Sequence, residues 1–227
     1  MGLLNFLSGR LHARGPNSGV RDTLFGDVPV EKWLPKNADE SARPWSEFVA
    51  AHTRLTAGDQ PGAVAAWRSI VEQPGLEPRH YLQAWHFLRA RGVQPPTDRA
   101  KSVLGVVVEV SLKEGLDLLA AYADYSARYY NHSGAGVVWE HPDTSLDSTI
   151  DTLLAAAGTI VAQIGPWKGE RPGPPSTGQA RLSFLTPSGL HFGQGDMGVL
   201  ASDPLAGGLL RTATLLMQGL IAKRGAA

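Results

Sequence analysis

The sharpest motif in the sequence is a glycine pattern at residues 193–198, GQGDMG, which matches the form G-x-G-x-x-G. In dinucleotide-binding proteins such glycines let the backbone approach a pyrophosphate at a helix N-terminus, and an acidic residue about twenty positions later binds the ribose. Here the next predicted helix begins only at Pro204, no parallel sheet is predicted, and no Asp or Glu follows Asp203. The motif is therefore interpreted as a flexible glycine loop, and no nucleotide cofactor is expected.

Metal chemistry finds little support in the spacing of the seven histidines. Neither H-x-x-x-H nor H-E-x-x-H occurs, so a metal site would need groups from distant segments, such as His132, His141, Asp143 and His191. The chain has no cysteine, which excludes disulfides, thiolate catalysis and cysteine-bound zinc or iron–sulfur clusters. We expect neither a metal ion nor any other cofactor.

A serine nucleophile is equally weakly indicated. Ser188 lies in Thr-Pro-Ser-Gly and lacks the G-x-S-x-G elbow of the serine hydrolases. Its surroundings are typical of a reverse turn, so Ser188 is interpreted as a turn residue.

One group of polar residues emerges from strand alternation. If Val106, Val108 and Val110 face a helix layer, then the polar residues at alternate positions share the opposite face of the sheet. These residues are Glu109, Arg128, Tyr130, His132, Glu140, Arg181, Ser183 and His191. Their mixture of acids, bases and aromatic groups fits a ligand or partner site, and it also fits a polar layer beneath the N-terminal helices. Both alternatives stay open at this stage.

The spacing of apolar residues changes after Pro95-Pro96, from the helical period to the alternation of β-strands, and this change predicts the elements that carry these residues. Alternating or continuous apolar runs, separated by turn residues, predict strands at 106–112, 116–123, 126–132, 137–140, 180–185 and 190–192. A helical apolar stripe runs from Leu146 to Ile164, and Asp203-Pro204 opens a last helix that ends near Lys223. Residues 165–179, rich in Gly and Pro, predict a mobile loop.

This order of elements predicts an α+β fold for residues 97–227. Tight turns make consecutive strands antiparallel, and two helices with one apolar stripe each can cover only one face. The expected architecture is a two-layer antiparallel sheet of order ββββαββα with both helices on one side.

Residues 45–96 have a helical period. Apolar stripes predict helices around Trp45–Leu55, Ala63–Val71 and Tyr81–Leu88. The middle of this part, with Gly58-Asp59 at the turn, Ala63 and Trp67 at packing positions and Pro74 at the end, resembles a tetratricopeptide repeat.

The resemblance covers roughly residues 45–92 and departs from the repeat pattern in places. Arg54 stands where the family prefers an aromatic residue, and Ala51 replaces the usual Gly. Pro95-Pro96 prevents the helix of a second full repeat, so we expect a helical hairpin plus one helix rather than a solenoid. The resemblance implies protein binding in a groove.

Residues 1–44 are predicted to form an extended arm with a short amphipathic helix. The predicted docking residues of that helix are Leu3, Leu4, Phe6, Leu7 and Leu11. Fewer than about 12 residues form a marginal helix in water, so this segment is expected to dock on the rest of the chain, on a second copy or on another protein.

Composition narrows the class of protein. The chain has 227 residues, 43% of them apolar and 19% charged, which favours a folded core over disorder. Basic and acidic residues balance at 21 each, so no nucleic-acid surface is expected.

The N-terminus lacks a secretory pattern, and the apolar stretch 205–222 is interrupted by glycines and Arg211. A cytoplasmic protein without stable membrane insertion is the expectation.

Together these features favour a non-enzymatic interaction or regulatory protein, similar to an adaptor, that binds another protein, a second copy of itself or a ligand. Four of the tryptophans lie in the N-terminal part, where aromatic residues suit a partner surface. The alternative is a small hydrolase or transferase that uses His132, His191 and Glu140 as acid and base groups.

Overall fold

The computed structural model describes residues 17–33 and 42–224. The predicted arm helix, with Leu3, Leu4, Phe6, Leu7 and Leu11, lies outside the described residues. No helix in the described ranges combines the length and the apolarity that crossing a membrane requires.

Three helices form the first part of the fold, as predicted: α2 (Trp45–Thr56), α3 (Gln60–Glu72) and α4 (Pro78–Ala90). The Asp59 carboxylate caps α3 by accepting a hydrogen bond from the Gly62 backbone N–H at 2.9 Å. Between the helices the side chains of Phe48, Trp67 and Phe87 are buried in one apolar cluster.

A single antiparallel sheet forms the second part, which confirms the predicted α+β class. Its strands lie in the order β4-β3-β2-β1-β5-β6. The strands are β1 (Gly105–Ser111), β2 (Leu116–Tyr122), β3 (Ala127–Tyr130), β4 (Gly136–Trp139), β5 (Gln179–Thr186) and β6 (Gly189–Asp196). β1 therefore lies in the middle of the sheet, between β2 and β5.

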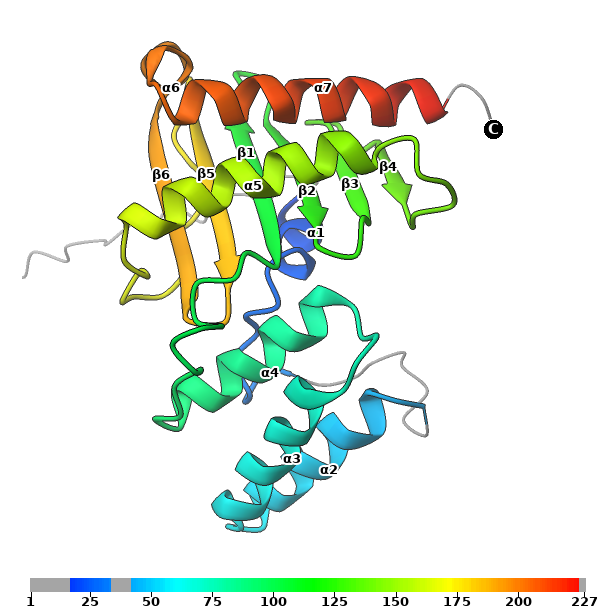
Figure 1. Ribbon diagram of the computed structural model, residues 1–227, viewed down its shortest axis with the longest axis vertical. Helices are drawn as coiled ribbons and strands as arrows, with labels where there is room; N and C mark the ends of the chain where they lie inside the picture. The colour runs from blue at the N-terminus through cyan, green and yellow to red at the C-terminus, as the bar shows by residue number, and fades with distance from the viewer. Residues whose placement is uncertain (1–16, 34–41, 225–227) are drawn as a thin grey trace, which may run out of the picture.

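Both long helices cover one face of the sheet, as expected. α5 (Asp147–Gln163) and α7 (Ala206–Arg224) run side by side across the strands, and the short α6 (Met197–Ser202) joins β6 to α7 (Figure 1). Val108, Leu153 and Leu216 are among the buried residues of the core between these layers.

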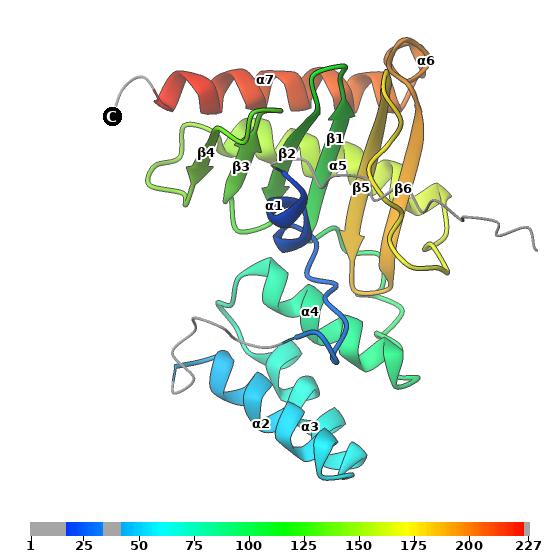
Figure 2. The same cartoon turned by 180° about the vertical axis from the view of Figure 1, so that it is seen from behind.

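The opposite face of the sheet is covered by the chain's own N-terminal segment, residues 17–33, with α1 (Ser18–Thr23). Figure 2 shows α1 in front of the strands, with the segment continuing down to α4. Leu24, Phe25 and Leu82 pack there against Val107 and Tyr122 in a third apolar cluster. The Tyr122 hydroxyl donates a hydrogen bond to the Leu24 carbonyl at 2.8 Å. This cluster joins the helical part to the sheet.

The expectation of a flexible glycine loop at residues 193–198 is wrong. Residues 193–196 complete β6 and residues 197–198 begin α6, so the glycine motif is not a flexible loop. The reason is backbone pairing: Gly193 and Gly195 lie in register with β5, which orders a strand that has no apolar alternation of its own.

The loop at residues 165–178 is irregular, as predicted, but the sheet and the N-terminal segment hold it in place rather than leaving it mobile. The Trp167 backbone N–H donates to the Leu190 carbonyl of β6 at 2.6 Å, and the Arg171 side chain pairs with Asp22 and Asp27. The loop runs over β5 on the same face as α1 (Figure 2). The Gly and Pro content of the loop therefore predicts that it lacks helix and strand, but it does not predict the contacts that hold the loop on the sheet.

At Gly26 the N-terminal segment crosses close to α4. Its φ is +59°, and a Cβ there would lie 2.7 Å from the Arg79 carbonyl oxygen and 2.9 Å from Leu82 Cβ. We expect Gly26→Ala to lower the free energy of unfolding by about 1–3 kcal/mol, because an L side chain is strained in this conformation. Gly19→Ala is the matched control: the added methyl group would meet no neighbouring atom within 4 Å, and alanine favours the helix. Urea denaturation of both variants tests this, and equal effects would contradict it.

Candidate functional site

Glu109, the central residue of the predicted polar face, is fully buried in β1. Its carboxylate accepts a hydrogen bond from Arg21 Nε at 2.5 Å and lies 3.4 Å from a terminal nitrogen of Arg181. Arg21 comes from α1 and Arg181 from β5, so three segments distant in sequence meet at one carboxylate. The alternation that placed Glu109 and Arg181 on one face is confirmed.

Each of the three guanidinium nitrogens of Arg181 donates a hydrogen bond. Its Nε and one terminal nitrogen donate to Gln194 Oε1 at 2.9 and 2.6 Å, and the other terminal nitrogen donates to the Gly173 carbonyl at 2.7 Å. Burial lowers the pKa of Arg181, and the negative charge of Glu109 acts in the opposite direction. The guanidinium is thus held from all sides by the chain itself.

Arg171 extends this network to the N-terminal segment. It pairs with Asp27 at 2.6 Å and with Asp22 at 2.9 Å, and its guanidinium lies 4.2 Å from the ring centroid of Phe25. Arg21 and Arg181 pair with Glu109, and Arg171 pairs with Asp22 and Asp27, so three arginines pair with three carboxylates. These ion pairs fasten the covering segments to the sheet, and the Glu109 carboxylate is fully buried between two arginines, whereas the Asp22 side chain is 53% exposed.

Arg128, Tyr130 and Glu140 lie on the same sheet face but apart from this network. Arg128 donates to Glu140 Oε1 at 2.8 Å, and Tyr130 packs beside the third apolar cluster. β2 and β1 lie between their strands and β5, which carries Arg181. The predicted face therefore holds two separate groups of polar side chains.

His132 lies just beyond the end of β3 and belongs to neither group. Its backbone N–H donates to Asp117 Oδ1 at 2.7 Å, and its Nδ1 lies 3.7 Å from the same oxygen.

The expected position of His191 is wrong. In the β5–β6 register His191 lies opposite Phe184, which is buried in the core beneath α5 and α7. Residues directly opposite each other share a face, so His191 lies on the helix side of the sheet, away from Glu109. It is fully buried, and this burial lowers its pKa. Ser183 follows the prediction: it pairs with Val107 on the Glu109 side and is buried.

The acid and base groups of the enzyme alternative are therefore not assembled. His191 is on edge strand β6, whereas His132 and Glu140 follow β3 and β4 at the other side of the sheet. His191 Nε2 does lie 3.1 Å from Ser188 Oγ, but that hydroxyl is also 2.9 Å from Thr186 Oγ1 within the same turn. Among the described residues no carboxylate bonds His191, so the pair lacks the orienting group of a nucleophilic serine.

A concave site that strand alternation did not reveal lies between the N-terminal segment and the helices. This junction pocket has a volume of about 250 Å³. Its apolar wall consists of Val28 and three aromatic residues, Trp33, Trp45 and Phe48. The ring centroids of Trp33 and Trp45 are 6.2 Å apart, and Trp45 lies edge-on to His80 at 5.0 Å. The sequence signal that pointed here is the concentration of tryptophan in the N-terminal part.

The polar wall of the junction pocket comes mainly from α4. Arg79 pairs with Glu77 at 2.5 Å, and Asp22 adds a carboxylate from α1. Gln83 binds both the N–H and the carbonyl of Val28, which fixes the N-terminal segment to α4. Burial lowers the pKa of His80, so its imidazole is neutral at pH 7. The pocket thus joins an aromatic wall to a rim of mixed charge.

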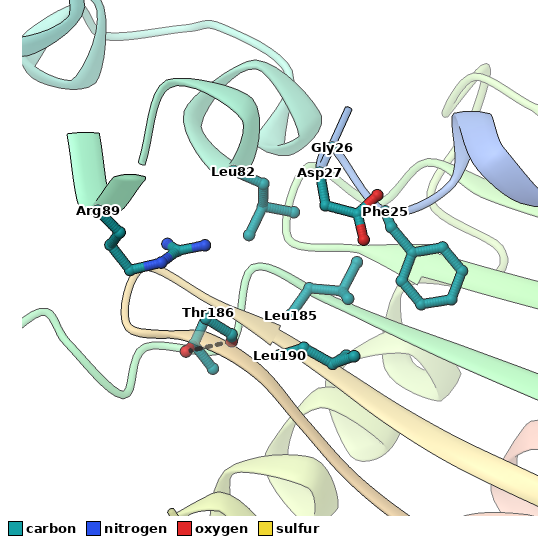
Figure 3. A pocket seen from close by; sticks show the side chains of 9 residues that line it. Phe25, Gly26, Asp27, Leu82, Arg89, Leu185, Thr186 and Leu190 are labelled. Atoms are coloured by element: carbon teal, nitrogen blue, oxygen red, sulfur yellow. Dashed lines mark hydrogen bonds between the residues drawn. The ribbon is translucent and has the colours of Figure 1, made fainter. Parts of the chain in front are cut away.

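On the other side of Gly26 lies a much smaller gap, drawn in Figure 3. Phe25, Leu82, Leu185 and Leu190 converge there, and Arg89 reaches over the β5–β6 turn to donate to the Pro187 carbonyl. Its volume of about 20 Å³ is close to that of a single water molecule. The gap is a packing seam between α4 and the sheet rather than a ligand site.

In residues 17–33 and 42–224, no cluster of three or more His, Asp or Glu side chains is placed to hold a metal ion. Comparison with known proteins gives no relative, because no family model, curated protein or solved structure matches the chain.

Proposed function

We propose that the protein is a non-enzymatic interaction or regulatory protein of the cytoplasm, whose junction pocket receives an apolar side chain of a protein partner. The observation that carries this proposal is the pocket itself, in which Trp33, Trp45 and Phe48 form one wall. Aromatic side chains in a concave, partly desolvated site are the usual anchors of protein interfaces. A volume of about 250 Å³ fits one large side chain rather than a cofactor.

The surroundings of the pocket support a protein partner over a small polar substrate. The rim carries Asp22 and Glu77 beside Arg79, so it can pair with charges of either sign around an apolar anchor. The packing of α2 against α3, with Ala63 and Trp67 fully buried, supports the resemblance to a tetratricopeptide-repeat hairpin. In that resemblance the hairpin serves as a scaffold for binding.

The test is affinity purification of the full chain from its native cell, comparing wild type with Trp45→Ala. We expect a stoichiometric partner protein, and we expect Trp45→Ala to weaken its purified complex about 30-fold, the effect of an interface hot spot. Trp167→Ala is the matched control, because Trp167 is half exposed and does not line the pocket.

Because Trp45 also packs against Phe48, a second variant separates binding from folding. Glu77→Lys changes the rim at an exposed position and should weaken binding with little change in melting temperature. A partner that binds wild type and both variants equally would contradict the proposal, as would the absence of any stoichiometric partner.

A further inference from the structure

A second cavity, of about 220 Å³, lies on the helix side of the sheet, between α7 and the β1–β2 hairpin. α7 crosses the strands here near the turn that joins β1 to β2 (Figure 1). Most of the wall is aliphatic: Val108, Val110, Leu112, Leu119, Leu210 and Met217. Leu112 is 39% exposed and Thr214 is exposed, so the cavity opens to solvent along the edge of α7.

One pair of polar side chains interrupts this apolar wall. The Tyr129 hydroxyl donates to Asp117 Oδ2 at 2.9 Å, and the His132 backbone N–H donates to Asp117 Oδ1 at 2.7 Å. A carboxylate offers about four lone-pair sites, so these two bonds leave acceptor capacity on both oxygens. Burial, with the hydrogen bond to Asp117 next, raises the pKa of Tyr129 to about 12, so the phenol stays protonated.

Charge complementarity then defines what the cavity can hold. Asp117 is the one charged side chain among the described residues that line it, and no Lys or Arg lines it. A partly desolvated carboxylate prefers a cationic hydrogen-bond donor over a neutral one, and it disfavours an anion. The rest of the wall is mainly apolar, so the remainder of the ligand must be apolar too.

We propose that this cavity binds a small apolar primary amine, with its ammonium group on Asp117 and its hydrocarbon body between β1 and α7. This inference is independent of the junction pocket and of the function proposed for it.

The volume limits the size of the amine. An apolar cavity of about 150 Å³ accommodates benzene, so about 220 Å³ accommodates about nine non-hydrogen atoms. Met197 and Met217 flank the space, and their unbranched thioethers can adapt to aromatic or aliphatic bodies. An arylalkylamine of the size of 2-phenylethylamine matches both the length and the single charge.

The experiment measures binding of 2-phenylethylamine to the full chain by titration calorimetry and by protein NMR. Two probes of nearly the same shape serve for comparison, the neutral 2-phenylethanol and the anionic phenylacetate. We expect the amine to bind at least about tenfold more tightly than the alcohol, since a hydrogen bond to a charged group is worth that factor or more, and we expect no binding of phenylacetate. Asp117→Asn should remove the preference for the amine while leaving the cavity intact.

Two tryptophan variants on α7 test the location. Thr214→Trp should block the opening and abolish binding, because Thr214 lines the cavity from an exposed position. Leu215→Trp is the matched control: Leu215 is 62% exposed and does not line the cavity. Neither substitution changes a buried side chain, so both proteins are expected to fold.

Three results would overturn the proposal. Equal affinity for the amine and the alcohol would show that Asp117 does not favour a cationic ligand over a neutral one. Equal loss of binding in Thr214→Trp and Leu215→Trp would place the probe elsewhere. Binding that appears only after residues 1–16 are removed would assign the cavity to those residues of the chain itself.

Discussion

Replacing Glu109 by glutamine is expected to lower the free energy of unfolding by about 3–5 kcal/mol, the usual cost of breaking a buried ion pair from one side. The substitution preserves the shape of the side chain but removes the negative charge between Arg21 and Arg181. Both guanidiniums are almost inaccessible to water, so solvent cannot replace the lost carboxylate. Urea denaturation at neutral pH, followed by circular dichroism, measures the change.

The matched control for this prediction is Glu140→Gln. Glu140 also pairs with an arginine, Arg128, but its own side chain is 58% exposed, so the expected loss is at most about 1 kcal/mol. If the two glutamine variants were destabilised equally, the buried network around Glu109 would not hold the N-terminal segment as described.

The second large effect is expected in the helical part. Trp67→Ala should lower the free energy of unfolding by about 3–5 kcal/mol, because it empties the centre of the cluster between α2, α3 and α4. Trp67 is 1% exposed, and its ring centroid lies 5.2 Å from that of Phe87. The same denaturation experiment applies.

Trp167→Ala provides the comparison for Trp67→Ala, since the same side chain is removed from a half-exposed position. Its expected cost is below about 1 kcal/mol. A loss of less than about 1 kcal/mol in Trp67→Ala would contradict the assignment of Trp67 to the core of the helical part.

The sequence predicts those helices and strands in which the spacing of apolar residues repeats within the element itself. The apolar stripes of α2, α3 and α4 and the alternation of β1 are repeated over enough residues to identify their type, and turn residues mark their ends. The same alternation correctly placed Glu109 and Arg181 on one face. In contrast, α6 and the second half of β6 carry no such repeat, and only pairing with β5 orders that half of β6.

The error at His191 has a specific cause. A two-residue turn at Pro187-Ser188 pairs Thr186 with Gly189, and that register places His191 opposite Phe184. The face of a residue on the second strand of a hairpin depends on the register through the turn, and here that register puts His191 on the face opposite to Arg181 and Ser183. Because Phe184 lies in the core, His191 must lie there too.

The candidate sites themselves could not be located from local pattern. The junction pocket is lined by the N-terminal segment with α1, by α2 and by α4, and the cavity of about 220 Å³ is lined by β1, β2, β3, α6 and α7. Their lining residues are close only because of how the helices and the N-terminal segment pack. The concentration of tryptophan in the N-terminal part indicated that this part contains a binding surface, but it did not indicate where the pocket lies.

The N-terminal segment also has a consequence for the order in which the protein forms. Arg21 is 88 positions from Glu109, and Arg171 is 149 positions from Asp22. At about 5–20 residues per second, a ribosome that has made Asp22 takes roughly 7–30 s to reach Arg171. During that time the helical part can form its contacts, which are short in sequence, and β1 to β4 are made, but β5 and β6 follow only after Arg171. We therefore expect the N-terminal segment to attach fully only after β5 and β6, the last strands to be synthesised, have completed the sheet face that it covers.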